Sequence, residues 1–187
     1  MSKPVHVNSW DALRAFTDAR IALGRTGASL PTDELLRFGL AHAQARDAVH
    51  QPFESERLAA DLHDAGWPTL AVHSQAVDRA AYLRRPDLGR RLALDSRRLL
   101  LGVPPRRTDL LLVVADGLSS KAVHRQALPL LQALRPYLDT LGLAIAPVVL
   151  AHQARVALGD EIGECLQARA VAVLIGERPG LSSPDSL

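Results

Sequence analysis

Two short loops carry residue types that are suited to holding a ligand. Residues 116–120 (Asp-Gly-Leu-Ser-Ser) and 176–180 (Gly-Glu-Arg-Pro-Gly) combine glycine with acidic or hydroxyl side chains, and each follows an apolar run. Glycine lets the backbone approach a ligand closely, and Ser119 and Ser120 would cap a helix whose first N–H groups face the same crevice. The Glu177 carboxylate can accept hydrogen bonds from amide or hydroxyl donors. Ordinary turns with surface charges explain both loops equally well.

A third segment matches a known motif, but its setting is wrong. Residues 61–66 (Asp-Leu-His-Asp-Ala-Gly) spell D-x-H-x-x-G, the signature of proteins that replace the lower base of cobalamin with a histidine. That motif must follow a strand, whereas here it ends a predicted helix with Gly66 as the C-cap. We therefore interpret the match as coincidence and His63 as a surface residue.

The remaining residues that could do chemistry do not form a recognisable catalytic group. The other histidines lack the spacing of a metal site, and Cys165 is the only cysteine, so neither a thiolate cluster nor an intrachain disulfide can form. The sequence contains no G-x-S-x-G, G-x-G-x-x-G or G-x-x-x-x-G-K-[ST] motif. We therefore expect no catalytic residue and no metal ligand in this chain.

The second part of the chain alternates between strand and helix patterns. Continuous apolar runs predict strands at 110–115, 143–150 and 170–175, with helices at 119–134 and 159–168 between them. We expect Pro129 to restart the first of these helices rather than to lie inside it. This order predicts an α/β fold, a Rossmann-like open and mostly parallel sheet whose ligands bind beyond the carboxyl ends of the strands.

The first hundred residues have helical spacing instead. The pattern predicts a helix beginning near Trp10 with Ser9 as its cap, and further helices at 31–50, 53–65, 76–83 and 85–101. We therefore divide the chain into a helical region, 1–100, and a Rossmann-like region, 101–187. Near the end, residues 182–185 (Ser-Ser-Pro-Asp) predict a helix start with only two residues after it, so we expect a truncated, incomplete second region.

Composition and charge exclude several classes of protein. The chain has 187 residues, 48% hydrophobic and 22% charged, which is typical of a globular protein. Its 22 basic and 20 acidic residues leave a net charge of +2, which gives no electrostatic reason to expect nucleic acid as a partner. The sequence shows no signal peptide and no membrane span. We expect a cytoplasmic protein, either free or inside a bacterial microcompartment.

Five stretches of the sequence, in the same order, resemble the small subunit of ethanolamine ammonia-lyase. They cover most of the chain, and together they are far more specific than any one of them. The stretches are 17–27 (TDARIALGRTG), 82–91 (YLRRPDLGRR), 114–119 (VADGLS), 155–164 (RVALGDEIGE) and 175–181 (IGERPGL).

The resemblance implies a function that the motifs alone do not give. Members of this family take part in the adenosylcobalamin-dependent conversion of ethanolamine to acetaldehyde and ammonia. The large subunit binds ethanolamine, and the cobalamin is held between the two subunits. The resemblance carries the cobalamin contacts to Val156 and Glu177. A third contact of the family is a cysteine in a later segment, which Cys165 does not match, so part of the pocket is absent from this chain.

A second class of function stays open at this point. The same strand and helix pattern would suit a stand-alone α/β module that binds a ligand, or a structural interaction protein. Association with a large subunit, with cobalamin bound only at the joint surface, would distinguish the lyase subunit from these alternatives.

Overall fold

The computed structural model describes residues 5–17, 19–104, 106–177 and 185–187. Residues 178–180 of the second glycine loop and the predicted helix start at 182–184 lie outside them. None of the helices in the described part is both long and apolar enough to cross a membrane. The elements, in chain order, are the 3₁₀ helix η1 (Asp11–Phe16), α1 (Thr32–His50), α2 (Ser55–Asp64), β1 (Thr69–His73), α3 (Arg79–Arg84), the 3₁₀ helix η2 (Leu88–Arg90), α4 (Leu94–Leu101), β2 (Leu111–Ala115), α5 (Ser120–Thr140), β3 (Val148–His152), α6 (Leu158–Cys165) and β4 (Val171–Ile175).

Four parallel strands form one sheet in the order β1-β3-β2-β4. In the register of the sheet, Val72 pairs with Ala151, and Val113 pairs with both Val149 and Val173. The predicted α/β fold with a parallel sheet is therefore confirmed. Because all strands run the same way, the sheet has a carboxyl edge, where the strands end, and an amino edge, where they begin.

Strand β1 was not predicted, since the sequence before residue 101 was read as helical. It comprises only five residues, and it pairs with β3 over its whole length. The sheet therefore draws strands from both sides of the division predicted at residue 101.

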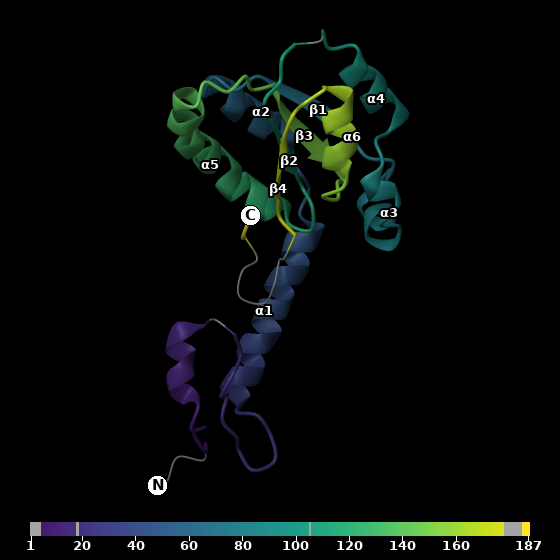
Figure 1. Cartoon of the computed structure of the whole chain (residues 1–187). Helices are drawn as coiled ribbons and strands as arrows, with labels where there is room; N and C mark the ends of the chain where they lie inside the picture. Colours follow the sequence, from purple (N-terminus) through teal and green to yellow (C-terminus); the bar gives the residue numbers. More distant parts are fainter. Residues whose placement is uncertain (1–4, 18, 105, 178–184) are drawn as a thin grey trace.

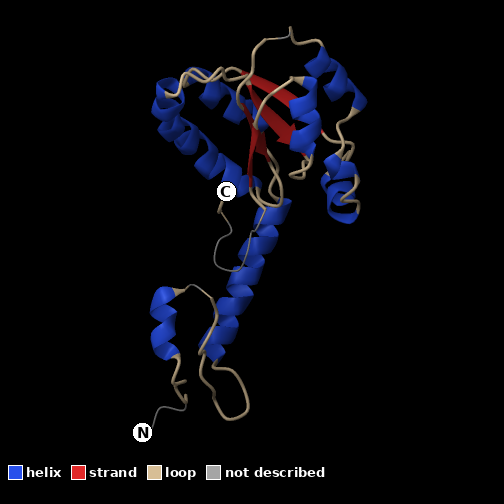
Figure 2. Cartoon of the chain, viewed as in Figure 1, coloured by secondary structure: helices blue, strands red, loops and turns tan. Residues whose placement is uncertain are grey.

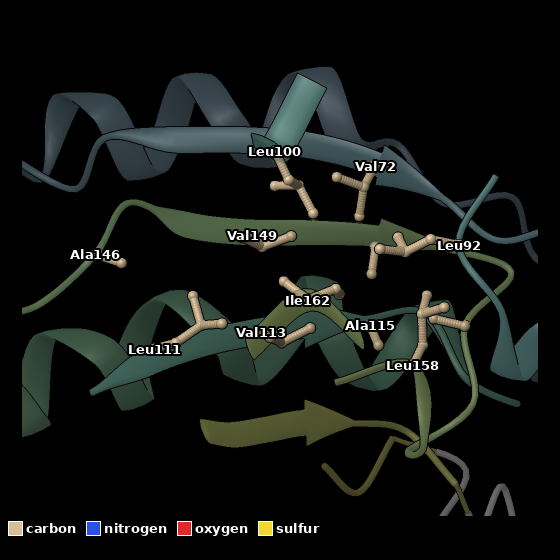
Figure 3. Close-up of a cluster of buried hydrophobic side chains, with 12 residues drawn as sticks. Val72, Leu92, Leu100, Leu111, Val113, Ala115, Ala146, Val149, Leu158 and Ile162 are labelled. Carbon is tan, nitrogen blue, oxygen red and sulfur yellow. The ribbon is translucent and has the colours of Figure 1, made fainter. Parts of the chain in front are cut away.

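Helices cover both faces of the sheet (Figure 2). Alternate residues of a strand point to opposite faces, so each strand contributes to two clusters of buried apolar side chains. On one face the strands pack against α4 and α6, as Figure 3 shows. On the other face they pack against α2 and α5. The first cluster includes Leu100, Leu111, Leu158 and Ile162, and the second includes Leu62, Trp67, Leu112, Leu131 and Leu150.

Several predicted boundaries are wrong, among them the end of the helix predicted at 119–134, which continues to Thr140, and three further differences have a clear physical cause. Pro129 does not restart a helix, because α5 continues through both Pro129 and Pro136. Each proline removes a backbone donor, but the buried side of α5 packs on the sheet along its length and keeps the helix continuous. The strand predicted at 143–150 is β3 and begins at Val148, after Pro147.

The third of these differences is in the helix predicted at 85–101. It is split into η2 and α4 by extended backbone at Arg91 (φ −122°, ψ 137°). There the Leu92 N–H donates to Glu161 Oε2 at 2.8 Å, and the Arg91 carbonyl accepts from the Gln75 N–H at 2.8 Å. These bonds to other segments replace those of a continuous helix.

The beginning of the chain forms an arm that projects from the body (Figure 1). We call the described residues of 5–40 the N-terminal arm. The helix predicted near Trp10 is the short η1, with Trp10 rather than Ser9 at its N-cap. Helix α1 connects the arm to the body and meets it at the carboxyl edge, where Arg79 Nε donates to the Val49 carbonyl at 2.6 Å.

Candidate functional site at the carboxyl edge

The carboxyl edge brings together the two loops that the sequence singled out. The loop at 116–119 follows β2, and Gly176 and Glu177 follow β4. The loop at 153–157 follows β3 and carries Val156. Val156 and Glu177 therefore lie at the same edge of the sheet, on either side of β2.

Both predicted contact residues are accessible. The Val156 side chain is 46% exposed in the turn before α6, and Glu177 is also exposed. Tyr82 contacts Arg155, the neighbour of Val156. Val156 and Glu177 follow the two strands that flank β2, and we call the surface of the carboxyl edge that carries both residues the rim.

The turn after β2 has the predicted serine cap. Ser119 Oγ accepts the Ala122 N–H at 3.1 Å at the start of α5, which confirms the cap. Gly117 has φ +54°, a conformation that glycine adopts at little cost. The next N–H, of Leu118, donates to the Gly176 carbonyl at 2.6 Å and so ties the two glycine loops together.

Asp116 turns its carboxylate inward, toward the loop after β3. Its two oxygens accept the N–H of Gln153 at 2.9 Å and the N–H of Ala154 at 3.0 Å. The residue is 1% exposed, and it forms an ion pair with Arg79 at 3.8 Å. Burial raises the pKa of Asp116, while the two backbone N–H groups and Arg79 oppose that shift.

Tyr82 contacts two guanidinium groups. The Arg79 and Arg155 guanidinium carbons are 4.7 and 4.3 Å from the centre of its ring. Its hydroxyl donates to the Ala154 carbonyl at 3.3 Å, and burial raises its pKa to about 12. Sequence reasoning missed both Tyr82 and Arg79, because neither belongs to a loop at a strand end. The available signal was that Tyr82 begins one of the five stretches that resemble the family.

Two histidines stack at the ends of β1 and β3. The rings of His73 and His152 are 5.7 Å apart and nearly parallel, and His152 Nε2 is 2.7 Å from Ser55 Oγ. Burial, together with the neighbouring His73, lowers the pKa of His152. Within the described residues, no group of His, Cys, Asp and Glu side chains is arranged to hold a metal ion.

Two other regions are weaker candidates for a ligand site than the carboxyl edge. His63, of the D-x-H-x-x-G match, is exposed at the end of α2, and Gly66 has φ +78° just beyond it, which confirms that the match is a helix end. A mainly apolar cavity opens at the amino edge. Ligands of open parallel sheets bind at the other edge, so we favour the rim with Val156 and Glu177. The cavity is lined by Leu101, Val103, Pro104, Arg106, Thr108, Ala146, Pro147, Cys165, Leu166 and Gln167.

Comparison with known proteins gives a consistent result. The family model of the ethanolamine ammonia-lyase light chain matches residues 7–187. Proteins named ethanolamine ammonia-lyase small subunit are 56% identical in Ralstonia nicotianae and 55% identical in Pseudomonas fluorescens strain Pf-5, each over 183 residues. These alignments cover 96% of this chain and 68% and 67% of the two relatives. The relative of the same name in Pseudomonas putida strain GB-1 is 56% identical over 187 residues, 98% of this chain and 69% of its own length. The chain therefore belongs to the ethanolamine ammonia-lyase light chain family, whose members are also called small subunits.

Proposed function

We propose that the chain is the cofactor-holding small subunit of an adenosylcobalamin-dependent ethanolamine ammonia-lyase, the enzyme that converts ethanolamine to acetaldehyde and ammonia. The observation that carries this proposal is the exposure of Val156 and Glu177 at one sheet edge, in a chain 56% identical to small subunits of that name. Bound adenosylcobalamin would supply the radical chemistry, which begins with homolysis of its cobalt–carbon bond.

The residues at the rim fit the chemistry of a corrin ring. Amide groups fringe the ring and donate hydrogen bonds, and the exposed Glu177 carboxylate is an acceptor for them. The half-exposed Val156 offers apolar contact to the ring system. In this proposal the chain binds and orients the cofactor and helps to exclude water, while the partner subunit binds ethanolamine.

The N-terminal arm supports the proposal of a partner. It exposes large apolar side chains, among them Trp10 at 66%, Phe16 at 86% and Leu36 at 68%. Apolar surface of this kind marks sites of protein interaction. Because α1 meets the body at the carboxyl edge, a large subunit could contact the arm and also cover the rim. A stand-alone module would leave the arm uncovered.

Reconstitution tests the proposal directly. We expect the chain to co-purify with a large subunit, and the pair to convert ethanolamine to acetaldehyde only when adenosylcobalamin is added. Omitting this chain, or omitting the cofactor, should abolish turnover. A large subunit that is equally active without this chain would contradict the proposal.

Glu177→Ala tests the rim itself. Loss of a charged acceptor should weaken adenosylcobalamin binding to the assembled complex by about 1–3 kcal/mol, roughly 5- to 150-fold. The affinity is measured by absorbance titration. Glu164→Ala is the matched control, because Glu164 is also exposed but lies near the other end of α6. If the two variants bind the cofactor equally well, Glu177 is not a contact.

A further inference from the structure

The loop that carries Val156 is held by contacts from distant segments. Asp116 accepts the N–H groups of Gln153 and Ala154, and Tyr82 donates to the carbonyl of Ala154. Both the N–H and the carbonyl of Ala154, two residues before Val156, are therefore hydrogen-bonded to side chains of distant segments.

We propose that Asp116 is a positioning residue for the cobalamin rim, and that its carboxylate fixes the loop at 153–157 so that Val156 is presented to the cofactor. This inference rests on the proposed function, because it assigns a task to a residue behind the same site. Asp116 does not touch the cofactor in this proposal; it acts through the backbone of the loop.

The conformation of the loop explains why it needs the two hydrogen bonds from Gln153 and Ala154 to Asp116, which we call the Asp116 clamp. Gln153 has φ +51°, in the left-handed region that residues other than glycine rarely adopt. A strained conformation persists only where its surroundings hold it, and the bond from the Gln153 N–H to Asp116 does so directly.

The buried charge of Asp116 indicates a role other than packing. A carboxylate that is 1% exposed loses its hydration, so an uncharged residue would suit packing alone better. What the carboxylate provides is two acceptor oxygens for two adjacent N–H groups, with a cation behind it.

Arg79 links this clamp to the rest of the edge. Its guanidinium donates to the carbonyl of Gly117 at 2.7 Å and to the carbonyl of Val49 at 2.6 Å. It also lies 3.8 Å from Asp116 and 3.4 Å from Gln153 Oε1. One side chain thus joins the end of α1 and the turns after β2 and β3.

The test is Asp116→Asn in the complex assembled with the large subunit. An amide offers one acceptor oxygen, and its NH₂ group would face the second backbone N–H. We expect about tenfold weaker binding of adenosylcobalamin, measured by absorbance titration. Turnover at saturating cofactor should return to within about twofold of wild type, because only the fit of the rim is changed.

Asp109→Asn is the matched control. Asp109 is also nearly buried and also accepts a backbone N–H, from Ala144 at 3.1 Å, but it lies at the amino edge. Its substitution should lower the melting temperature and leave the affinity for adenosylcobalamin unchanged. Equal loss of affinity in the two variants would show a merely structural role and overturn the inference.

The remaining outcomes separate the inference from the proposed function. If Glu177→Ala weakens cofactor binding and Asp116→Asn does not, the inference fails and the proposed function stands. If neither does, the proposed rim itself is wrong. Should Asp116→Asn fail to assemble, Tyr82→Phe removes only the bond to Ala154, and we expect about threefold weaker cofactor binding. Unchanged affinity in that variant would overturn the inference.

Discussion

Each edge of the sheet holds an aspartate that is paired with arginine, but the exposure of the arginine side chains differs between the two edges. At each edge an aspartate accepts backbone N–H groups from the segment that flanks β3. At the carboxyl edge, Asp116 is 1% exposed and its cation Arg79 has a side chain only 18% exposed. At the amino edge, Asp109 pairs with Arg107 and Arg169, whose side chains are both 76% exposed.

The different surroundings of the two aspartates shift their pKa values in opposite directions. Burial raises the pKa of Asp116, whereas the Ala144 N–H and the two arginines lower the pKa of Asp109. The amino edge is therefore stabilised by its carboxylate. At the carboxyl edge, burial of the Asp116 carboxylate costs free energy of desolvation. Groups with pKa values shifted in this way are often found at functional sites. Position in the fold, rather than residue type, therefore separates an acid that stabilises the fold from one that we propose to position a loop.

Alanine at a glycine of each edge should give the largest contrast in stability. Gly117 and Gly142 both have positive φ, +54° and +60°. Both substitutions therefore incur a strain of about 1–2 kcal/mol. At Gly117 the new Cβ would also lie 2.5 Å from Ile175 Cγ1 and 2.7 Å from the Gly176 carbonyl, which adds about 1–3 kcal/mol of overpacking. Chemical denaturation should show a loss of about 4 kcal/mol for Gly117→Ala.

Gly142→Ala is the control for backbone strain alone. No atom of the described residues lies within 4 Å of the position that its Cβ would take, so we expect a loss of only about 1 kcal/mol. Equal losses in the two variants would contradict the close packing of the carboxyl edge.

Tyr82 should make the carboxyl edge sensitive to alkali. Burial raises its pKa to about 12 from an ordinary value of 10.0. A raised pKa means that the phenol stabilises the fold fully below pH 10, and that this contribution is lost as the pH rises toward about 12. The loss amounts to about 3 kcal/mol.

The measurement is phenolate absorbance together with stability as a function of pH. The chain has two tyrosines, so subtracting the titration of Tyr82→Phe from that of wild type isolates Tyr82. The variant should lose less stability than wild type between pH 10 and 12. A Tyr82 that titrates with a midpoint near 10 would show that burial of the phenol does not govern its pKa.

The sequence predicted those parts of the structure that depend on local pattern. Continuous apolar runs gave β2 and β4, and glycine with serine after β2 gave the turn and the Ser119 cap. Strand β1 was missed because its apolar run, residues 70–72 (Leu-Ala-Val), is only three residues long and lies between the polar residues Thr69 and His73. Its place in the sheet is decided by pairing with β3, which no local pattern reports.

The same limit explains which residues of the site were found. Val156 came from the resemblance, Glu177 from both the resemblance and its loop after an apolar run, and Asp116 from its place after another apolar run. Arg79 and Tyr82 lie within a short helix and bond to residues 30 and 72 positions away, Val49 and Ala154. Contacts over such distances follow from the packing of the sheet, and only the structure could reveal them.

His152 offers the smallest and most specific test of the carboxyl edge. Burial and the neighbouring His73 lower its pKa below the ordinary value of 6.5. The unfolded chain therefore binds the proton more readily than the folded one, so stability is full above pH 6.5 and falls as the pH drops below it. Thermal unfolding of His152→Asn should show a shallower decline in acid. Ser55→Ala removes the partner of His152 but keeps the imidazole, so its stability should still decline as in wild type. If the acid decline persists unchanged in His152→Asn, this partly buried histidine is not its cause, and the acid sensitivity belongs elsewhere in the molecule.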